Sequence, residues 1–242
     1  MLYRRTQLSR GFTLIEVLVA LSLMALLTLM SWRGLDAMLR VAQVTRANSA
    51  GLGALQVGLA QWAVDLDRVL ETPDVAALDW DGRVLRLVRS SPVGSAEAVL
   101  VVAWTQRIAA GAQHWARWQS APVSQRSDLL NAWQQAAIWA RTEGDMQTDW
   151  DRTHASASGA SAVAVMPLGG WQLAYHAGGE WVASNTLVGS GVGRRALQAN
   201  AVVVNLSDTP EGLRLLLELP SGGPLQGRLS SDWFNPASVV VR

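Results

Sequence analysis

The feature that most constrains this chain is an apolar run near its N-terminus, from Phe12 to Trp32 (FTLIEVLVALSLMALLTLMSW), with Glu16 as its charged residue. As a helix rising about 1.5 Å per residue, the run would be roughly 30 Å long, which matches the hydrocarbon core of a bilayer. Arg4, Arg5 and Arg10 precede it, so the positive-inside rule places the N-terminus in the cytoplasm. The sequence therefore predicts a single-pass membrane protein whose larger part lies across the membrane.

Two simpler interpretations of the run leave features unexplained. A secretory signal peptide has an apolar region of about 7–15 residues and then a small-residue cleavage site, whereas this run is longer and no such site follows it. A plain membrane anchor fits the length but gives no reason for Glu16, because an acid inside an apolar span costs roughly 2.5–3.5 kcal/mol. Glu16 is therefore a candidate functional residue.

Residues 10–18 (RGFTLIEVL) resemble the type III signal of type IV pilins and type II secretion pseudopilins. The resemblance implies that a prepilin peptidase cuts between Gly11 and Phe12, removes the 1–11 leader and methylates Phe12, and that the chain needs no cofactor. It also implies that Glu16 pairs with the new amine of a neighbouring subunit. A carboxylate in lipid is unstable alone and tolerable beside a cation, which agrees with this pairing. The alternative is a carboxyl group that stays protonated or reaches the headgroups.

Helical periodicity continues beyond the membrane segment. An apolar stripe with spacings of three and four residues comprises Leu52, Leu55, Leu59, Trp62, Leu66 and Val69. We expect one helix from Phe12 to about Leu70, ended by Pro73 because proline cannot continue a helix. Glycines predict a bend near residues 33–34 or 51–53. Residues 12–32 would form the transmembrane and assembly segment, with Trp32 and Arg33 at the membrane interface, and residues 33–72 its amphipathic continuation.

Residues 73–242 are predicted to form a β-rich domain. Short apolar or alternating segments predict strands at 83–89, 99–105, 114–120, 171–176, 180–184, 201–206, 213–219 and 238–241. The 114–120 strand could pair back on 99–105, and Ala177-Gly178-Gly179 predicts a second hairpin. Residues 128–141 predict a short helix, and 153–162 and 187–195 predict small-residue loops. The expected fold class is α+β, with a long N-terminal helix packed on antiparallel β-sheet, as the pilin resemblance also implies.

The amino-acid composition excludes several kinds of enzyme chemistry. The chain has no cysteine and no lysine, which excludes disulfides, thiolate nucleophiles, cysteine-ligated metals and lysine bases. His114, His154 and His176 share no metal-ligand spacing. The acidic stretch Glu143–Asp151 lacks the order of a calcium loop and is predicted to be a solvated loop, although calcium binding by some pseudopilins leaves that alternative open. We predict neither an enzyme nor a metal site.

The charged and aromatic residues indicate what the domain contacts. Without the three leader arginines, 17 arginines face 19 acidic residues, and no basic face is visible, so no nucleic-acid partner is expected. Five of the 12 tryptophans lie on predicted apolar faces and are expected in the core: Trp62, Trp104, Trp133, Trp139 and Trp171. Trp150 and Trp233 lie in polar contexts, and we predict subunit contacts for them.

Within that family, several segments of the chain resemble the minor pseudopilins of type II secretion. Asp65-Leu66-Asp67, residues 82–89, the 99–120 hairpin and residues 170–173 (GWQL) are similar to the J-type subunit. The resemblance implies a non-enzymatic pseudopilus-tip protein in the inner membrane with its domain in the periplasm. Its partners would be prepilin peptidase, I- and K-type minor pseudopilins, the major pseudopilin, membrane lipid and the secreted substrate. The alternatives are a minor pilin of a type IV pilus, a membrane-anchored periplasmic enzyme, or a module that recognises the secreted substrate or a carbohydrate through Trp150 and Trp233.

Overall fold

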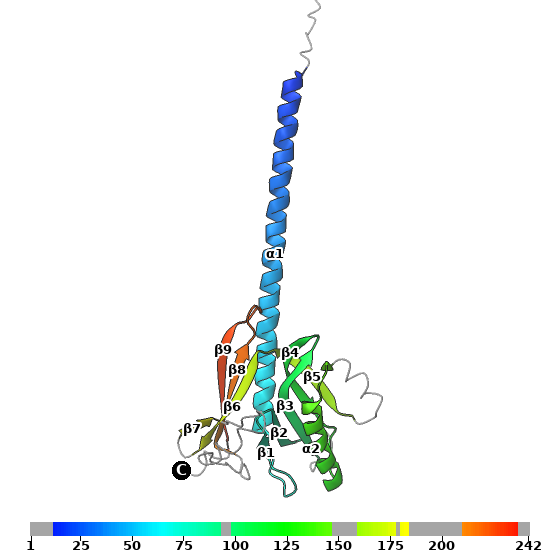
Figure 1. The fold of residues 1–242 in the computed structure, drawn as a ribbon, viewed down its shortest axis with the longest axis vertical. Coiled ribbons are helices and arrows are strands. Elements are labelled where there is room, and N and C mark those ends of the chain that lie inside the picture. The colour runs from blue at the N-terminus through cyan, green and yellow to red at the C-terminus, as the bar shows by residue number, and fades with distance from the viewer. Residues whose placement is uncertain (1–11, 93–97, 147–158, 178–179, 184–209, 237–242) are drawn as a thin grey trace, which may run out of the picture. The chain divides into compact units, whose positions relative to one another are not determined.

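The computed structural model describes residues 12–92, 98–146, 159–177, 180–183 and 210–236. The chain divides into two compact units, Met1–Ser49 and Ala50–Arg242. The helix α1 (Leu14–Asp67) has residues in both units, and its backbone stays helical through residues 33–34 and 51–53, where the glycines predict a bend (Figure 1). The long N-terminal helix of the pilin-like expectation is confirmed.

The end of α1 is not set by Pro73, contrary to the prediction from sequence. The helix ends at Asp67. Beyond it, the backbone N–H of Leu70 donates to the carbonyl of Val88 at 2.9 Å, and the N–H of Ser90 donates to the carbonyl of Arg68 at 3.0 Å. The chain leaves the helix because its backbone begins to pair with a strand, and this pairing precedes the proline.

The first sheet has five antiparallel strands in the order β1-β2-β3-β4-β5. Its strands are β1 (Leu78–Trp80), β2 (Val84–Ser90), β3 (Val99–Ala109), β4 (Ala112–Gln119) and β5 (Ser161–Pro167). The predicted pairing of β4 back on β3 is confirmed. Ala110 and Gly111 join these strands with φ of 49° and 75°. Positive φ at both turn residues gives the twist that a two-residue hairpin needs.

The second sheet has four antiparallel strands in the order β7-β6-β8-β9. Its strands are β6 (Gly170–Ala177), β7 (Glu180–Ala183), β8 (Gly212–Leu219) and β9 (Gly227–Phe234). The hairpin predicted around residues 177–179 is confirmed by the pairing of Ala177 with Glu180. The predicted strands at 201–206 and 238–241 and the loop at 187–195 lie outside the described residues.

Three strands were not predicted from the sequence: β1, β5 and β9. Part of β5 corrects the prediction of a small-residue loop at 153–162, because Ser161 and Ala162 pair with Gln119 and Trp118 of β4. β5 lies at the edge of its sheet, and in β9 most side chains are exposed. Strands of this kind are held by backbone pairing with a neighbour, and in β9 the side chains carry little hydrophobic signal.

The first sheet is covered on both faces within the Ala50–Arg242 unit. Leu85 and Trp104 pack in one cluster with the last turns of α1, whereas Val88 and Ala103 pack in another with α2 (Arg126–Arg141). The predicted 128–141 helix is thus confirmed. A strand buried on both faces has no polar side to alternate with, which explains the apolar run at the start of β3 (VLVVAW).

The second sheet buries one face, and its side chains alternate. Leu213, Leu215 and Leu217 of β8 are buried in the main hydrophobic cluster, whereas Leu216 between them is 37% exposed. One face of the second sheet therefore belongs to the core, and the other remains available at the surface.

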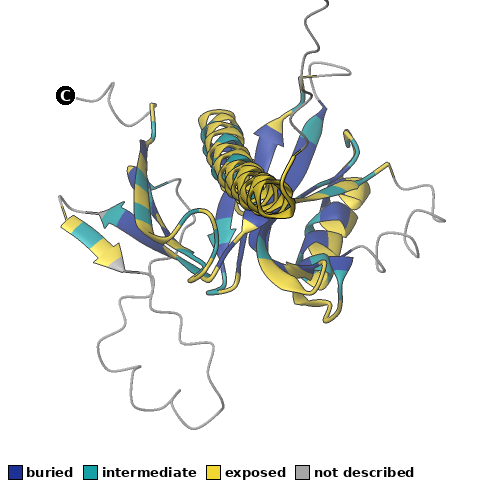
Figure 2. Ribbon diagram, turned by 90° about the horizontal axis from the view of Figure 1, so that it is seen from above, coloured by how far each residue is buried: buried dark blue, intermediate teal, exposed yellow. Residues whose placement is uncertain are grey.

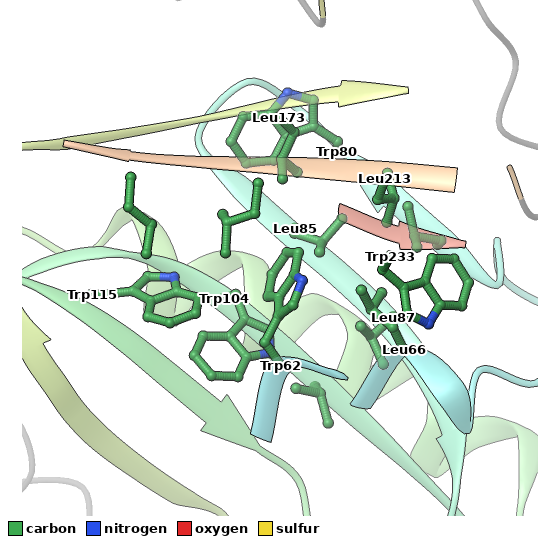
Figure 3. Packing of buried hydrophobic residues seen from close by; sticks show 14 of the residues in the cluster. Trp62, Leu66, Trp80, Leu85, Leu87, Trp104, Trp115, Leu173, Leu213 and Trp233 are labelled. Atoms are coloured by element: carbon green, nitrogen blue, oxygen red, sulfur yellow. The ribbon is translucent and has the colours of Figure 1, made fainter. Parts of the chain in front are cut away.

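Tryptophans form the centre of the core, as Figure 3 shows. The ring of Trp62 on α1 lies 5.6 Å from that of Trp104, 5.8 Å from that of Trp115 and 6.3 Å from that of Trp171. The predicted core positions of Trp62 and Trp104 are confirmed, with 2% and 0% exposure. Trp171 is half-buried and packs against this cluster.

The remaining tryptophan predictions have mixed outcomes. Trp133 and Trp139 are half-buried and pack against the α2 side of the first sheet. The prediction that Trp233 contacts another subunit is wrong: it is 8% exposed, and its indole N–H donates to Asp67 Oδ1 at 2.7 Å. The polar neighbours of Trp233 in the sequence suggested exposure, but the carboxylate that accepts the hydrogen bond from its indole N–H lies on α1, far away in sequence. Trp150 lies outside the described residues.

Candidate functional site

The N-terminus of α1 is capped by reciprocal hydrogen bonds between Thr13 and Glu16. The backbone N–H of Glu16 donates to Thr13 Oγ1 at 3.4 Å, and Thr13 donates through its N–H at 3.5 Å and its hydroxyl at 3.3 Å to Glu16 Oε2. This is a capping box, the T-x-x-E arrangement that satisfies two orphan donors of a helix start. It keeps the carboxylate in the first helical turn, where the helix dipole favours negative charge.

Phe12 lies immediately before this cap and is 84% exposed. Gly11, the other residue of the predicted cleavage site, lies outside the described residues. The structure brings Glu16 into the turn next to Phe12, as the spacing in the sequence predicts. Cleavage at this bond, methylation of Phe12 and the intersubunit role of Glu16 stay predictions.

The apolar part of α1 presents large hydrophobic side chains on all sides. Its most apolar 18-residue window has a mean hydropathy of 2.3, and no residue of that window is buried. Among the described residues, this is the helix long and apolar enough to cross a membrane by length and composition. Figure 2 shows this part of the helix exposed all round. A surface of this kind needs lipid or other apolar helices around it.

Two hydroxyl groups in the span are satisfied within the helix. Ser22 Oγ donates to the carbonyl of Leu18 at 2.8 Å, and Thr28 Oγ1 donates to the carbonyl of Met24 at 2.7 Å. Side chains bonded in this way add no unpaired polar group to an apolar surrounding. Among the described residues of the span, Glu16 is consequently the one whose charge still needs an oppositely charged partner.

The end of the span carries the predicted interface residues. Trp32 is 71% exposed, and Arg33 is also exposed. One turn further on, Asp36 and Arg40 form an exposed ion pair at positions i and i+4. Charged residues thus begin where the apolar run stops. The placement of Trp32 and Arg33 at a membrane surface stays a prediction.

A buried charge centre, which the sequence analysis missed, fastens the end of α1 to the first sheet. Asp65 is 0% exposed. Its Oδ2 accepts hydrogen bonds from Arg117 Nε at 2.7 Å and from Trp104 Nε1 at 2.9 Å. Its Oδ1 accepts from Arg117 Nη2 and from Gln61 Nε2, both at 2.9 Å. Four hydrogen bonds thus hold one carboxylate inside the unit.

A second arginine completes this centre. Arg89 Nε lies 3.4 Å from Asp65 Oδ1, and Arg89 Nη2 donates to Gln119 Oε1 at 3.3 Å. Burial lowers the pKa of Arg89; Asp65 raises it, and the nearby positive charge of Arg117 lowers it further. One buried aspartate therefore serves two buried arginines. The signal was present in the sequence, because Asp65 follows Trp62 by three residues inside the apolar stripe.

The described residues contain no group of His, Asp and Glu side chains placed to hold a metal ion. In the acidic stretch considered for calcium, Asp145 Oδ2 accepts the N–H of Gly111 at 3.0 Å and so braces the β3–β4 turn. Asp149 and Asp151 lie outside the described residues. His114 contacts the carbonyl of Ala112 through Nδ1 at 3.0 Å, a structural role.

Comparison with known families identifies a motif at the N-terminus. Residues 7–32 match the family model described as the prokaryotic N-terminal methylation motif. The chain therefore carries the N-terminal methylation motif of the type IV pilin and pseudopilin family. The motif implies processing by prepilin peptidase, and it is the motif of pilin-like structural subunits. Its N-terminal apolar helix is of the prepilin type, consistent with anchoring in the inner membrane.

Proposed function

We propose that this protein is a J-type minor pseudopilin of a type II secretion system. In this proposal prepilin peptidase cleaves between Gly11 and Phe12 and methylates Phe12. The mature subunit then joins I- and K-type minor pseudopilins at the tip of the pseudopilus, above the major pseudopilin, and helps drive folded proteins across the outer membrane. The observation that carries the proposal is the methylation motif at residues 7–32, set at the start of a helix whose most apolar 18-residue window has no buried residue.

The geometry of the capping box supports the assembly step. Cleavage turns Phe12 into a free cationic amine beside Thr13, and the cap keeps the carboxylate of Glu16 in the adjacent turn. An unpaired charge in lipid costs roughly 2.5–3.5 kcal/mol, so a neighbour's amine that reaches Glu16 removes most of that cost. Because every subunit carries both groups, a stagger between helices can satisfy one carboxylate after another.

The size of the second unit supports a place at the tip. It carries a five-stranded and a four-stranded sheet on the end of one helix. In a helical fibre each repeating subunit must fit between its neighbours, whereas a subunit at the end is free of that restriction on one side. A bulky domain with its own core therefore suits a terminal subunit better than a repeating one.

Processing is tested with Gly11→Ser in the full chain. A side chain at this position should disturb the scissile turn, so the longer precursor should accumulate in the inner membrane. Intact mass of the wild-type protein should show a chain that begins at methylated Phe12. A native protein that still begins at Met1, or that is cut after residue 32, contradicts the proposal.

Assembly is tested with Glu16→Val, with Asp36→Asn on the same helix as the matched control. The Glu16 variant should be cleaved normally and should fail to co-purify with the I- and K-type subunits. The Asp36 variant should behave as wild type, because the Asp36 carboxylate is exposed and its partner is the exposed Arg40. Normal secretion by the Glu16 variant would count against the charge-pair account.

The methylation motif is shared with type IV pilins, which makes a minor pilin the second candidate. A deletion strain separates the two. Loss of exoprotein secretion with intact surface pili supports the pseudopilin, and loss of pili with intact secretion supports the minor pilin.

A further inference from the structure

We propose that the free edge of β9 pairs with an extended segment of a different subunit, which adds a strand to the second sheet. β9 is the last strand in the order β7-β6-β8-β9 and is labelled in Figure 1. One of its edges pairs with β8 over all eight residues. No strand in the described part of the chain pairs with its other edge. The inference rests on the proposed function for the partner, because the assembly supplies the subunit that donates the strand.

The backbone of β9 directs every second residue outward. The N–H of Asn235, just after the strand, donates to the carbonyl of Glu211, just before β8, at 2.8 Å. In an antiparallel ladder, residues that bond to the neighbouring strand alternate with residues whose N–H and C=O groups point away from it. The outward residues of β9 are therefore Arg228, Ser230, Asp232 and Phe234. Their N–H and C=O groups recur about every 6.8 Å, which is the repeat of another strand.

The other three sheet edges have features that hinder the addition of a strand. β1 and β7 are short, with three and four residues. β5 ends at Pro167, and its pairing with β4 shifts register between Trp115 and Ala116. β9 has eight residues, no proline and a regular register. A long and regular free edge is the kind of surface that accepts a peptide strand through backbone hydrogen bonds.

The charged side chains of β9 are compensated within the sheet. Arg228 Nη2 lies 3.4 Å from Glu218 Oε1, and Asp232 accepts hydrogen bonds of 2.7 and 2.6 Å from Arg214. Both charged residues of β9 lie on the face opposite to Leu229, which packs against the core. Because each charge has a partner on β8, no excess charge repels an approaching strand.

The position of β9 beside α1 disfavours a second copy of this chain as the occupant. Trp233 near the end of β9 donates to Asp67 Oδ1 at 2.7 Å, and Leu225 just before β9 lies 3.3 Å from where a Cβ at Gly51 would be. Two β9 strands paired antiparallel would therefore turn their α1 helices in opposite directions, whereas copies anchored in one membrane leave it in the same direction. Paired parallel and in register, they would place Arg228 beside Arg228. A different subunit meets neither obstacle.

Exposed apolar side chains of α1 indicate the chemistry of the added strand. Ala60 and Val64 lie seven and three residues before Asp67, and so on the helix face that reaches β9. Both are exposed, Val64 by 39%, and Val57, three residues before Ala60, is 69% exposed. A strand added beyond β9 would place every second side chain over this row. Those side chains should therefore be apolar, so that their burial adds to the backbone pairing.

The test measures hydrogen exchange at single amides of the full chain in mild detergent, free and in complex. The partners are purified I- and K-type subunits and, as a second set, minor pilins of a type IV pilus. In the complex, exchange at the four outward residues of β9 should slow by about tenfold or more. The three residues between them should exchange slowly in both states, because they pair with β8. Contact with a sheet face would not produce this alternation.

A variant tests the backbone contribution directly. Ser230→Pro removes one outward N–H and leaves the pairing with β8 intact, since proline is tolerated on an edge strand where its nitrogen faces solvent. It should weaken partner binding about tenfold. Ser230→Thr keeps the N–H and is the matched control, which should bind as wild type does. Unchanged near-UV circular dichroism shows that each variant is folded, and the exchange pattern of the wild-type chain decides the question independently of both variants.

The outcomes separate this inference from the proposed function. A complex with I- or K-type subunits that leaves exchange at the outward residues unchanged overturns strand addition and leaves the function standing. Alternating protection with minor pilins alone supports strand addition and overturns the pseudopilin assignment. The same protection in the chain by itself at high concentration assigns the edge to a second copy and overturns the inference. The absence of a complex with either set of partners contradicts both.

Discussion

Replacing Asp65 by asparagine should be among the most damaging single changes in the second unit. The substitution keeps the shape of the side chain but removes the charge that two buried arginines share. Arg117 and Arg89 have side chains that are 13% and 6% exposed, so water cannot replace the lost partner. Breaking a buried ion pair by removing one member costs about 3–5 kcal/mol. Because a domain is stable by only about 5–15 kcal/mol, that loss is a large fraction of the total.

The measurement is urea unfolding of the full chain in mild detergent, followed by the near-UV circular dichroism of the tryptophan cluster. A loss of 3–5 kcal/mol corresponds to a fall in melting temperature of roughly 6–20 °C for a unit of this size. Asp36→Asn is the control: it removes a carboxylate from an exposed ion pair on the same helix, and should cost less than about 0.5 kcal/mol.

A double variant sharpens the test. With Arg117→Met already present, Asp65→Asn should lower the free energy of unfolding by less, because one of the two arginines that lose their partner is already absent. The interaction energy between the two substitutions should lie within about 0.5–3 kcal/mol. If Asp65→Asn alone stays within about 1 kcal/mol of wild type, the carboxylate is not the electrostatic anchor described above.

Two further perturbations test the packing and the electrostatics of the same unit. Gly58→Ala should destabilise by about 1–2 kcal/mol, because a Cβ there would lie 2.7 Å from Val165 Cγ1 and overpacking outweighs the gain in helix propensity. Gly53→Ala, where a Cβ meets nothing within 4 Å, should be neutral or stabilise by up to about 1 kcal/mol in the same unfolding assay, and equal effects of the two changes would refute the packing argument. Asp81 is partly buried, which raises its pKa, but hydrogen bonds from backbone N–H groups and from Arg141 outweigh this and lower the pKa below 3.8. Because its pKa is lower in the folded chain, Asp81 stabilises the fold at pH values above its pKa in the unfolded chain, and this contribution is lost as the pH falls through its pKa in the folded chain. The stability advantage of wild type over Asp81→Asn should therefore shrink below about pH 4. A constant difference from pH 6 to pH 3 would contradict this.

The elements predicted correctly are those whose own side chains carry the signal. The long helix, α2 and strands such as β2 and β8 have apolar patterns with a clear period or a clear run. β1 is too short for such a pattern, and β9 has mostly polar exposed side chains. β5 (SAVAVMP) is mostly apolar, and its signal was missed because it directly follows a stretch of small residues that predicted a loop. β1 and β9 exist because a neighbouring strand offers hydrogen bonds, and no local propensity reports the neighbour.

The N-terminal site could be predicted because its chemistry is local. The residues from Gly11 to Glu16 are adjacent along the chain, so the motif and its acid near the helix start can be recognised from their spacing. The hydrogen-bonded cap between Thr13 and Glu16 was not predicted. The Asp65 centre and the position of Trp233 could not be predicted in this way. Each depends on residues far apart in the chain: Asp65 and Arg117 are separated by 52 positions, and Asp67 and Trp233 by 166.

The sequence by itself determined the apolar length of the first helix, the acid placed near its start and the absence of cysteine and lysine chemistry, because those properties depend on which residues follow one another. The tertiary structure alone decided which polar groups are buried together and which face of the second sheet stays open. Burial and pairing are properties of segments that meet in space, and the same aspartate is a solvated charge on an isolated helix and an anchor once Arg117 and Trp104 close around it.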